Sequence, residues 1–241
     1  MTPQINEIWV YLSASPLLGL TITLLAYQGA FWLYRRSGTN PLVNPVLIAV
    51  TVLVLLLTLT ATSYETYFAG AQFVHFLLGP ATVALAVPLY TQFRRVRAMM
   101  LPVLAGLVAG SLTAALSAIA VARLFGASLP TQLSLAPKSV TTPIAMGIAE
   151  RIGGIPSLTA VLVIITGIIG AGGARYVFDA MKLRDPAIRG FAIGVASHGI
   201  GTARAFQVNE QSGAFAALVM GLNGALTALL VPMLAGWLTG G

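Results

Sequence analysis

The stretch LSLAPKSVTTPIAMGIAERIGGIP (Leu133–Pro156) gathers polar and turn-forming residues within a chain that is 57% hydrophobic. We expect a helix to begin at Pro143, because proline is favoured in the first turn of a helix. A lysine and three hydroxyl side chains then precede this helix: Lys138, Ser139, Thr141 and Thr142. Free backbone N–H groups and the positive end of the helix dipole lie at the same place. The stretch therefore predicts a site for an anion.

Composition indicates the class of protein. Only 8% of the 241 residues are charged and the mean hydropathy is +0.90, whereas soluble domains carry about a quarter charged residues. The chain has six long uncharged intervals: 8–34, 37–64, 66–93, 98–122, 152–174 and 211–241. Each is long enough for a membrane-spanning helix, which needs about 20 apolar residues. We therefore predict an all-α polytopic membrane protein.

Several functional classes are not expected. The net charge of +7 does not indicate nucleic-acid binding, because basic loops of membrane proteins face the cytoplasm and contact anionic headgroups. The chain has no cysteine, and its two histidines are too few for a typical metal site. We expect no enzyme, since Ser197 and His198 are adjacent on a helix and no aspartate completes a triad. No cofactor is expected, and a coupling proton or cation stays open.

The apolar runs predict about seven spanning helices and one re-entrant segment in a single membrane domain. The expected spans are 9–34, 42–62, 73–93, 99–124, 156–178, 191–206 and 214–238, and the re-entrant segment is 136–152. A polar patch at 63–72 separates the second span from the third. Residues 1–38 hold an additional N-terminal helix, residues 42–124 a first repeat and residues 133–241 a second repeat.

The basic loops predict the orientation. Arg35, Arg36 and the cluster Arg94–Arg97 belong in the cytoplasm, which places the N-terminus outside. If residues 136–152 enter and return without crossing, then Lys182, Arg184 and Arg189 also lie inside; if that segment crosses, they lie outside. The re-entrant interpretation is favoured for this reason, and with seven spans it places the C-terminus in the cytoplasm.

Two pairs of similar segments predict an inverted repeat. FLLGPATVALA (76–86) and ASHGIGTARAF (196–206) share a G-x-x-T core, and LVAGSLTAALSAI (107–119) resembles LVMGLNGALTALL (218–230). Inverted repeats with broken helices are typical of secondary transporters, whose site lies near the bilayer midplane. The predicted helix breaks are Pro45, Gly79, Pro80, Pro143, Gly199 and Gly201. The alternative at each G-x-x-T segment is a simple kink whose freed backbone groups are satisfied by nearby hydroxyls.

The chain resembles the LrgB/CidB family in four strings: NPVLIA (44–49), GPATVALAVPLY (79–90), PKSVTTPIAMGIAERIGGIPSLTAVLVIITGIIGA (137–171) and ASHGIGTARA (196–205). The resemblance implies one of two functions. The first is antiholin-like regulation of murein hydrolase export and cell lysis. The second is small-carboxylate transport, as in bacterial pyruvate transport systems and the plastid glycolate/glycerate translocator. It also implies the bacterial cytoplasmic (inner) membrane and a separate small LrgA/CidA-type membrane partner. A homodimer through the small-residue spans stays open.

A carboxylate carrier would use the polar residues of these motifs. Lys138 would supply the counter-charge, and Arg204 would grip a carboxylate in bidentate fashion. His198 would hydrogen-bond a substrate hydroxyl or carry a coupled proton. The other expected substrate-binding residues are Ser139, Thr141, Thr142, Ser197, Thr202, Thr82 and Asn44. Two alternatives are that Lys138 extends to the headgroups and that Arg204 neutralises Glu210 or a lipid phosphate.

The sequence favours transport over lysis control. A holin-like or antiholin role needs no polar midplane site and no inverted repeat. We therefore expect a secondary transporter of small monocarboxylates or 2-hydroxy acids (glycolate-, glycerate-, pyruvate- or lactate-like) that works by alternating access.

Overall fold

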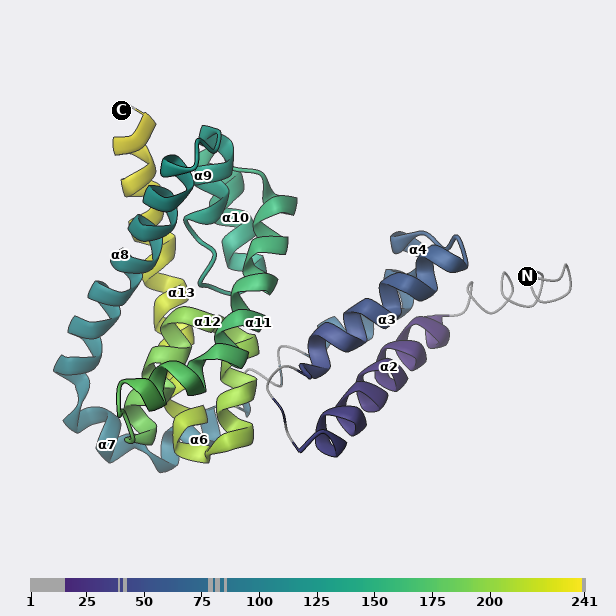
Figure 1. Ribbon diagram of the computed structural model, residues 1–241, viewed down its shortest axis with the longest axis horizontal. Helices are drawn as coiled ribbons and strands as arrows, with labels where there is room; N and C mark the ends of the chain where they lie inside the picture. Colours follow the sequence, from purple (N-terminus) through teal and green to yellow (C-terminus); the bar gives the residue numbers. More distant parts are fainter. Residues whose placement is uncertain are drawn as a thin grey trace, which may run out of the picture. The chain divides into compact units, whose positions relative to one another are not determined.

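The computed structural model describes residues 16–38, 40, 43–77, 80, 83, 84 and 86–239, and the regular structure of these residues is entirely helical. The chain forms two units, Met1–Ala84 and Leu85–Gly241. Figure 1 shows the helices of each unit. Four described helices are long and apolar enough to cross a membrane: Leu17–Arg36, Met100–Leu124, Pro156–Ala180 and Glu210–Gly236. The chain is thus a helical membrane protein.

The first unit holds α2 (Pro16–Arg36), α3 (Pro45–Leu59) and α4 (Tyr64–Phe76). The predicted polar patch at 63–72 lies mostly within α4. The Thr23 and Tyr67 hydroxyls share a hydrogen bond of 2.8 Å that joins α2 to α4. Pro45 occupies the first turn of α3, where proline is tolerated, so it begins a helix and does not break one.

The second unit contains eight described helices: α6 (Ala86–Thr91), α7 (Phe93–Ala98), α8 (Met100–Leu124), α9 (Leu129–Leu135), α10 (Thr142–Ile152), α11 (Pro156–Ala180), α12 (Pro186–Val208) and α13 (Glu210–Thr239). The long helices α8, α11 and α13 agree with the predicted spans 99–124, 156–178 and 214–238 to within a few residues.

The helices α8 and α13 run in the same direction, and α11 runs against them. Ser111 donates a hydrogen bond to Asn223 Oδ1 at the middle of the α8–α13 interface. Packed around it are Val103, Leu107, Phe215 and Val219 toward the starts of both helices, and Ala115, Ile119 and Val231 toward their ends. Val163, early in α11, belongs to the latter cluster. Phe178, near the end of α11, packs with Ala216 near the start of α13.

The first hairpin (residues 129–152) enters the unit from the C-terminal end of α8. Its entering limb is α9 followed by irregular backbone, and its returning limb is α10, which begins at Thr142 beside Pro143. The backbone N–H of Ile155 donates to Ser134 Oγ at 2.8 Å, so the chain after α10 is back beside α9. The 11 residues of α10 span only about 16 Å, too little for a crossing. This is the course expected of the re-entrant segment 136–152.

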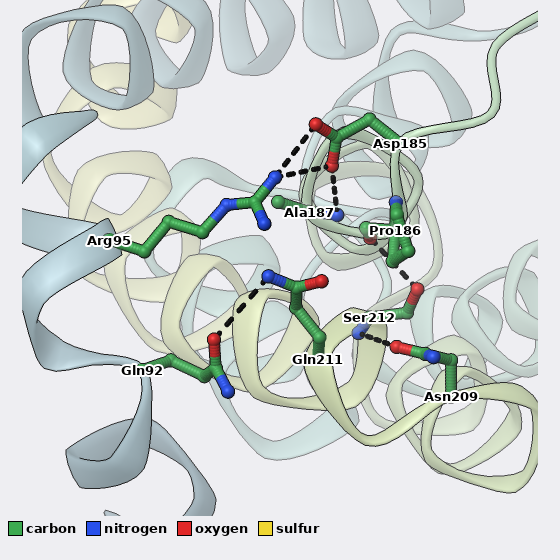
Figure 2. A network of polar contacts seen from close by, with 8 residues as sticks. All are labelled: Gln92, Arg95, Asp185, Pro186, Ala187, Asn209, Gln211 and Ser212. Carbon is green, nitrogen blue, oxygen red and sulfur yellow. Dashed lines mark hydrogen bonds and ion pairs between the residues drawn. The ribbon is translucent and has the colours of Figure 1, made fainter.

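The second hairpin (residues 186–208) is α12, which doubles back at His198. Figure 2 shows that Ser212, in the first turn of α13, holds both of its ends. Ser212 Oγ donates to the Pro186 carbonyl at 2.8 Å, and the Ser212 N–H donates to Asn209 Oδ1 at 3.1 Å. Arg95 of α7 adds a bond to Asp185, with Nη2 at 2.9 and 2.8 Å from the two carboxylate oxygens.

Close packing on α13 fixes the direction of each half of α12. In the first half, a Cβ at Gly190 or Gly194 would meet the α13 backbone at Ser212 or Ala216. In the second half, Thr202 Oγ1 lies 3.7 Å from Met220 Sδ. The Phe206 ring, further along that half, packs against Gly213, nearer the start of α13. The first half therefore runs with α13 and the second half runs against it.

This course corrects two predictions. The predicted span 191–206 does not cross, because both ends of α12 lie at the α7 end of the unit. The C-terminal end of α13 lies at the opposite end from α7 (Figure 1). The predicted position of the C-terminus, on the same side as Arg94–Arg97, is therefore wrong: a helix that returns contributes no crossing.

The predicted repeat of 42–124 and 133–241 extends over both units, and its symmetry stays a prediction. Within the second unit, a shorter arrangement occurs twice in opposite directions. The helix α8 is followed by the first hairpin, and α11 is followed by the second hairpin. The two hairpins consequently enter from opposite ends of the unit.

Candidate functional site

A pocket of about 620 Å³ lies where the tips of the two hairpins meet the middles of α8 and α11. It is lined by Ala109, Gly110, Thr113, Ala114, Lys138, Ser139, Thr166, Ile169, Gly170, Val195, Ala196 and Ser197. Each spanning helix has 25 residues, about 37 Å, and supplies residues from its middle. A bilayer with a hydrocarbon core of about 30 Å would therefore have the pocket near its midplane.

Lys138 is the one charged side chain among the described residues that line the pocket. It is half-buried at the tip of the first hairpin, and its Nζ lies 3.4 Å from Ser139 Oγ. Within the described part of the chain, no carboxylate lies at ion-pair distance from it. A cation removed from water without a counter-charge is costly. An anionic ligand would relieve that cost.

Three hydroxyl groups add polar atoms to this pocket, on Thr113, Thr166 and Ser197. Several threonines in the described helices donate to a carbonyl of their own helix, as Thr51 does to Leu47 at 2.8 Å. Thr113, Thr166 and Ser197 form no such bond, so their hydroxyls are available to a ligand. Thr113 and Thr166 were not among the predicted site residues. The sequence holds one feature that could have identified them: each is a hydroxyl in the middle of a 25-residue apolar helix.

His198 shapes the tip of the second hairpin. Its φ of 39° and ψ of −138° interrupt the helix, and such torsions are strained for a residue with a side chain. The ring is buried, with Nε2 2.8 Å from the Val163 carbonyl, and it packs so closely on α11 that a Cβ at Gly167 would lie 2.7 Å from it. Thr202 Oγ1 donates to the His198 carbonyl at 2.8 Å. Both residues stabilise the break and do not line the pocket.

Two helix N-termini begin close to the pocket-lining residues. The helix α10 begins shortly after Ser139, and its N-cap residue Thr141 makes no side-chain capping bond. The break at His198 divides α12 into two halves, and the second half begins at Gly199, shortly after Ser197. N–H groups at helix N-termini attract anions. They add to the positive character that Lys138 gives the pocket, although Thr141 and Thr142 do not line it themselves.

The other predicted site residues are not brought into this pocket. Arg204 is half-buried in the second half of α12, where Nη1 donates to Gln207 Oε1 at 3.3 Å. Asn44 lies in the first unit and caps α3, with Oδ1 accepting from Val46 and Leu47 N–H groups at 2.9 and 3.2 Å. Pro80 is exposed. Gly79 and Thr82 lie outside the described residues. In the part of the chain that is described, no three His, Cys, Asp or Glu side chains group as metal ligands.

Comparison with known proteins finds relatives over most of the chain. The family model described as "LrgB-like family" matches residues 23–237. The uncharacterized protein YxaC of Bacillus subtilis (strain 168) is 35% identical over 219 residues, 91% of this chain and 94% of the relative. The antiholin-like protein LrgB of Bacillus cereus (strain B4264) is 29% identical over 219 residues, 91% of this chain and 95% of the relative. No solved structure matches.

Proposed function

Since the chain belongs to the LrgB-like family, as its motifs predict, we propose that it is a secondary transporter of small monocarboxylates or 2-hydroxy acids. The candidate substrates resemble glycolate, glycerate, pyruvate or lactate. The observation that supports the proposal most is Lys138, a half-buried cation without an ionic partner among the described residues, at a pocket midway along two spanning helices.

The pocket suits an anion with a single charge. One ammonium group balances one carboxylate, whereas a second carboxylate would lie in a low-dielectric region without a counter-charge. The hydroxyls of Ser139 and Ser197 can donate to the carboxylate from the two hairpin tips. Those of Thr113 and Thr166 can bond an oxygen on the neighbouring carbon atom, from α8 and α11.

Transport by alternating access would open this pocket to one side of the membrane and then to the other. We place the protein in the bacterial cytoplasmic membrane with Arg94–Arg97 and Lys182 in the cytoplasm, because basic loops face inward. The C-terminus then lies outside. The protein would act without an enzymatic reaction and without a cofactor, driven by exchange or by a coupled proton or cation. A small LrgA/CidA-type membrane protein is the proposed partner.

Uptake into proteoliposomes tests the function. Purified protein, alone or with the small partner, is reconstituted and offered radiolabelled glycolate, lactate or pyruvate, with succinate as the dianionic control. We expect saturable uptake of the monocarboxylates and little uptake of succinate. Absence of flux for every small monocarboxylate, with and without the partner, contradicts the proposal.

A second candidate is control of murein hydrolase export and lysis, and the printed names of relatives such as the antiholin-like LrgB of Bacillus cereus favour it. The two candidates differ in what the pocket does. A Lys138→Met variant that keeps normal lysis control but loses uptake would separate lysis from transport. If lysis control follows uptake through a series of pocket variants, altered carboxylate flux accounts for it.

A further inference from the structure

Asn223 is a fully buried carboxamide in the middle of α13, only 1% exposed. A buried polar group in an apolar environment is costly unless its atoms are hydrogen-bonded. Both ends of this side chain are used. Asn223 Nδ2 donates to the Val195 carbonyl at 3.1 Å, and Oδ1 accepts from Ser111 Oγ and, at 3.4 Å, from Thr227 Oγ1. One amide therefore joins three helices.

The Val195 carbonyl needs this partner because of the break in α12. In a continuous helix it would accept from the N–H of Gly199, one turn later. That bond would span His198, whose torsions are not helical. Asn223 Nδ2 donates to this carbonyl from α13, so the backbone beside the break is stabilised from a neighbouring helix.

The same side chain links two walls of the pocket. Val195 lines it from the second hairpin, and Gly110, next to Ser111, lines it from α8. These walls touch: a Cβ at Gly110 would lie 2.9 Å from Val195 Cγ1. Asn223 Oδ1 accepts a hydrogen bond from Ser111 of α8, and Asn223 Nδ2 donates one to the Val195 carbonyl of α12.

We propose that Asn223 is a positioning residue that sets the spacing between α8 and the tip of the second hairpin, through one hydrogen bond from each end of its carboxamide. The importance of that spacing for substrate rests on the proposed transport function, whereas the spacing itself does not. A side chain of similar size without the amide leaves Ser111 and the Val195 carbonyl unpaired, and the tip of the hairpin separates from α8.

Thiol labelling tests the spacing without any substrate. The chain has no cysteine, so Ala196→Cys, at an exposed position in the pocket, gives a single reactive site for a membrane-impermeant maleimide. Asn223→Leu removes both bonds at similar volume. Thr227→Val is the matched control, since it removes only the 3.4 Å contact. We expect labelling to become roughly tenfold faster in Asn223→Leu and to stay unchanged in the control.

Uptake measured on the same proteins separates the two proposals. If Asn223→Leu raises KM for glycolate with little change in kcat, the spacing serves substrate binding. If the parent protein shows no uptake while the labelling rates change as expected, the transport function fails and the positioning role stands. Equal labelling rates in Asn223→Leu and its parent overturn the positioning role. Should Asn223→Leu fail to fold, Ser111→Ala replaces it, with a smaller increase expected and an unchanged rate again contradicting the proposal.

Discussion

The two hairpins that meet at the pocket are built in opposite ways. The first carries a charge at its tip, Lys138, on a limb of irregular backbone that ends at Thr141. The second carries no charge at its tip, and its halves dock on α11 and α13 so closely that glycines such as Gly170 and Gly194 leave no room for a Cβ. The first hairpin supplies the charge of the candidate site, and the second supplies the Ser197 hydroxyl and a closely packed wall.

The largest expected effect is at the charged tip. If Lys138 binds the substrate as proposed, Lys138→Met removes a charge-assisted bond of about 3 kcal/mol, so uptake should fall about 100-fold. The thermal unfolding midpoint should stay the same or rise, because no described carboxylate loses a partner. The control is Arg204→Gln, outside the pocket, which should keep uptake within about threefold. Full uptake by Lys138→Met would exclude this lysine from the site.

The closely packed hairpin should show its effect in stability. A Cβ at Gly170 would lie 2.8 Å from Ser197 Cβ, whereas at Gly173 nothing lies within 4 Å. Gly170→Ala should therefore destabilise by about 1–3 kcal/mol through overpacking. Gly173→Ala on the same helix should stabilise by about 0.5–1 kcal/mol, because alanine favours the helix. Thermal unfolding in detergent measures both, and equal midpoints would show that the second hairpin does not need this close approach.

The spanning helices could be predicted from the sequence because of the length of its uncharged runs. Uncharged runs such as 98–122 and 152–174 are long enough to cross and have one stable placement in a bilayer. The run 191–206 is shorter, and its hydropathy does not tell whether it crosses or returns. Its return depends on tertiary contacts that hydropathy does not report, above all those of Ser212, just beyond α12, which bonds to both of its ends.

The site was predictable where chemistry is local. Lys138 and Ser139 stand out because a lysine and hydroxyls interrupt an apolar sequence, and both line the pocket. Arg204 stands out equally, yet it lies two helical turns beyond the tip of its hairpin, and periodicity alone does not reveal a reversal at His198. Thr113 and Thr166 were missed because a threonine within a span usually bonds its own helix.

Substitutions at the break at His198 should change stability by a smaller amount, and glycine should be favoured over alanine there. His198→Ala and His198→Gly both lose the bond to the Val163 carbonyl, about 1 kcal/mol. Only glycine adopts a φ of 39° without strain. The glycine variant should therefore be more stable than the alanine variant by about 1 kcal/mol, the reverse of the order in a regular helix. Matched thermal scans decide this, and an alanine variant that is the more stable of the two would mean that α12 is not broken there.

The smallest effect is expected where the second hairpin is held from outside, at Asp185. This carboxylate pairs with Arg95 at 2.8 Å and also caps α12 by accepting from the Ala187 N–H at 2.8 Å. Asp185→Asn keeps the cap, since asparagine is a good N-cap residue, and removes only a half-exposed ion pair. Such pairs contribute at most about 1 kcal/mol and are screened by salt, so the loss should vanish in concentrated salt. Asp185→Ala should lose about 1 kcal/mol more at every salt concentration, because the cap is lost as well. If the two variants unfold at the same temperature, the ion pair and not the cap holds this end, and the second hairpin depends on charge as the first one does.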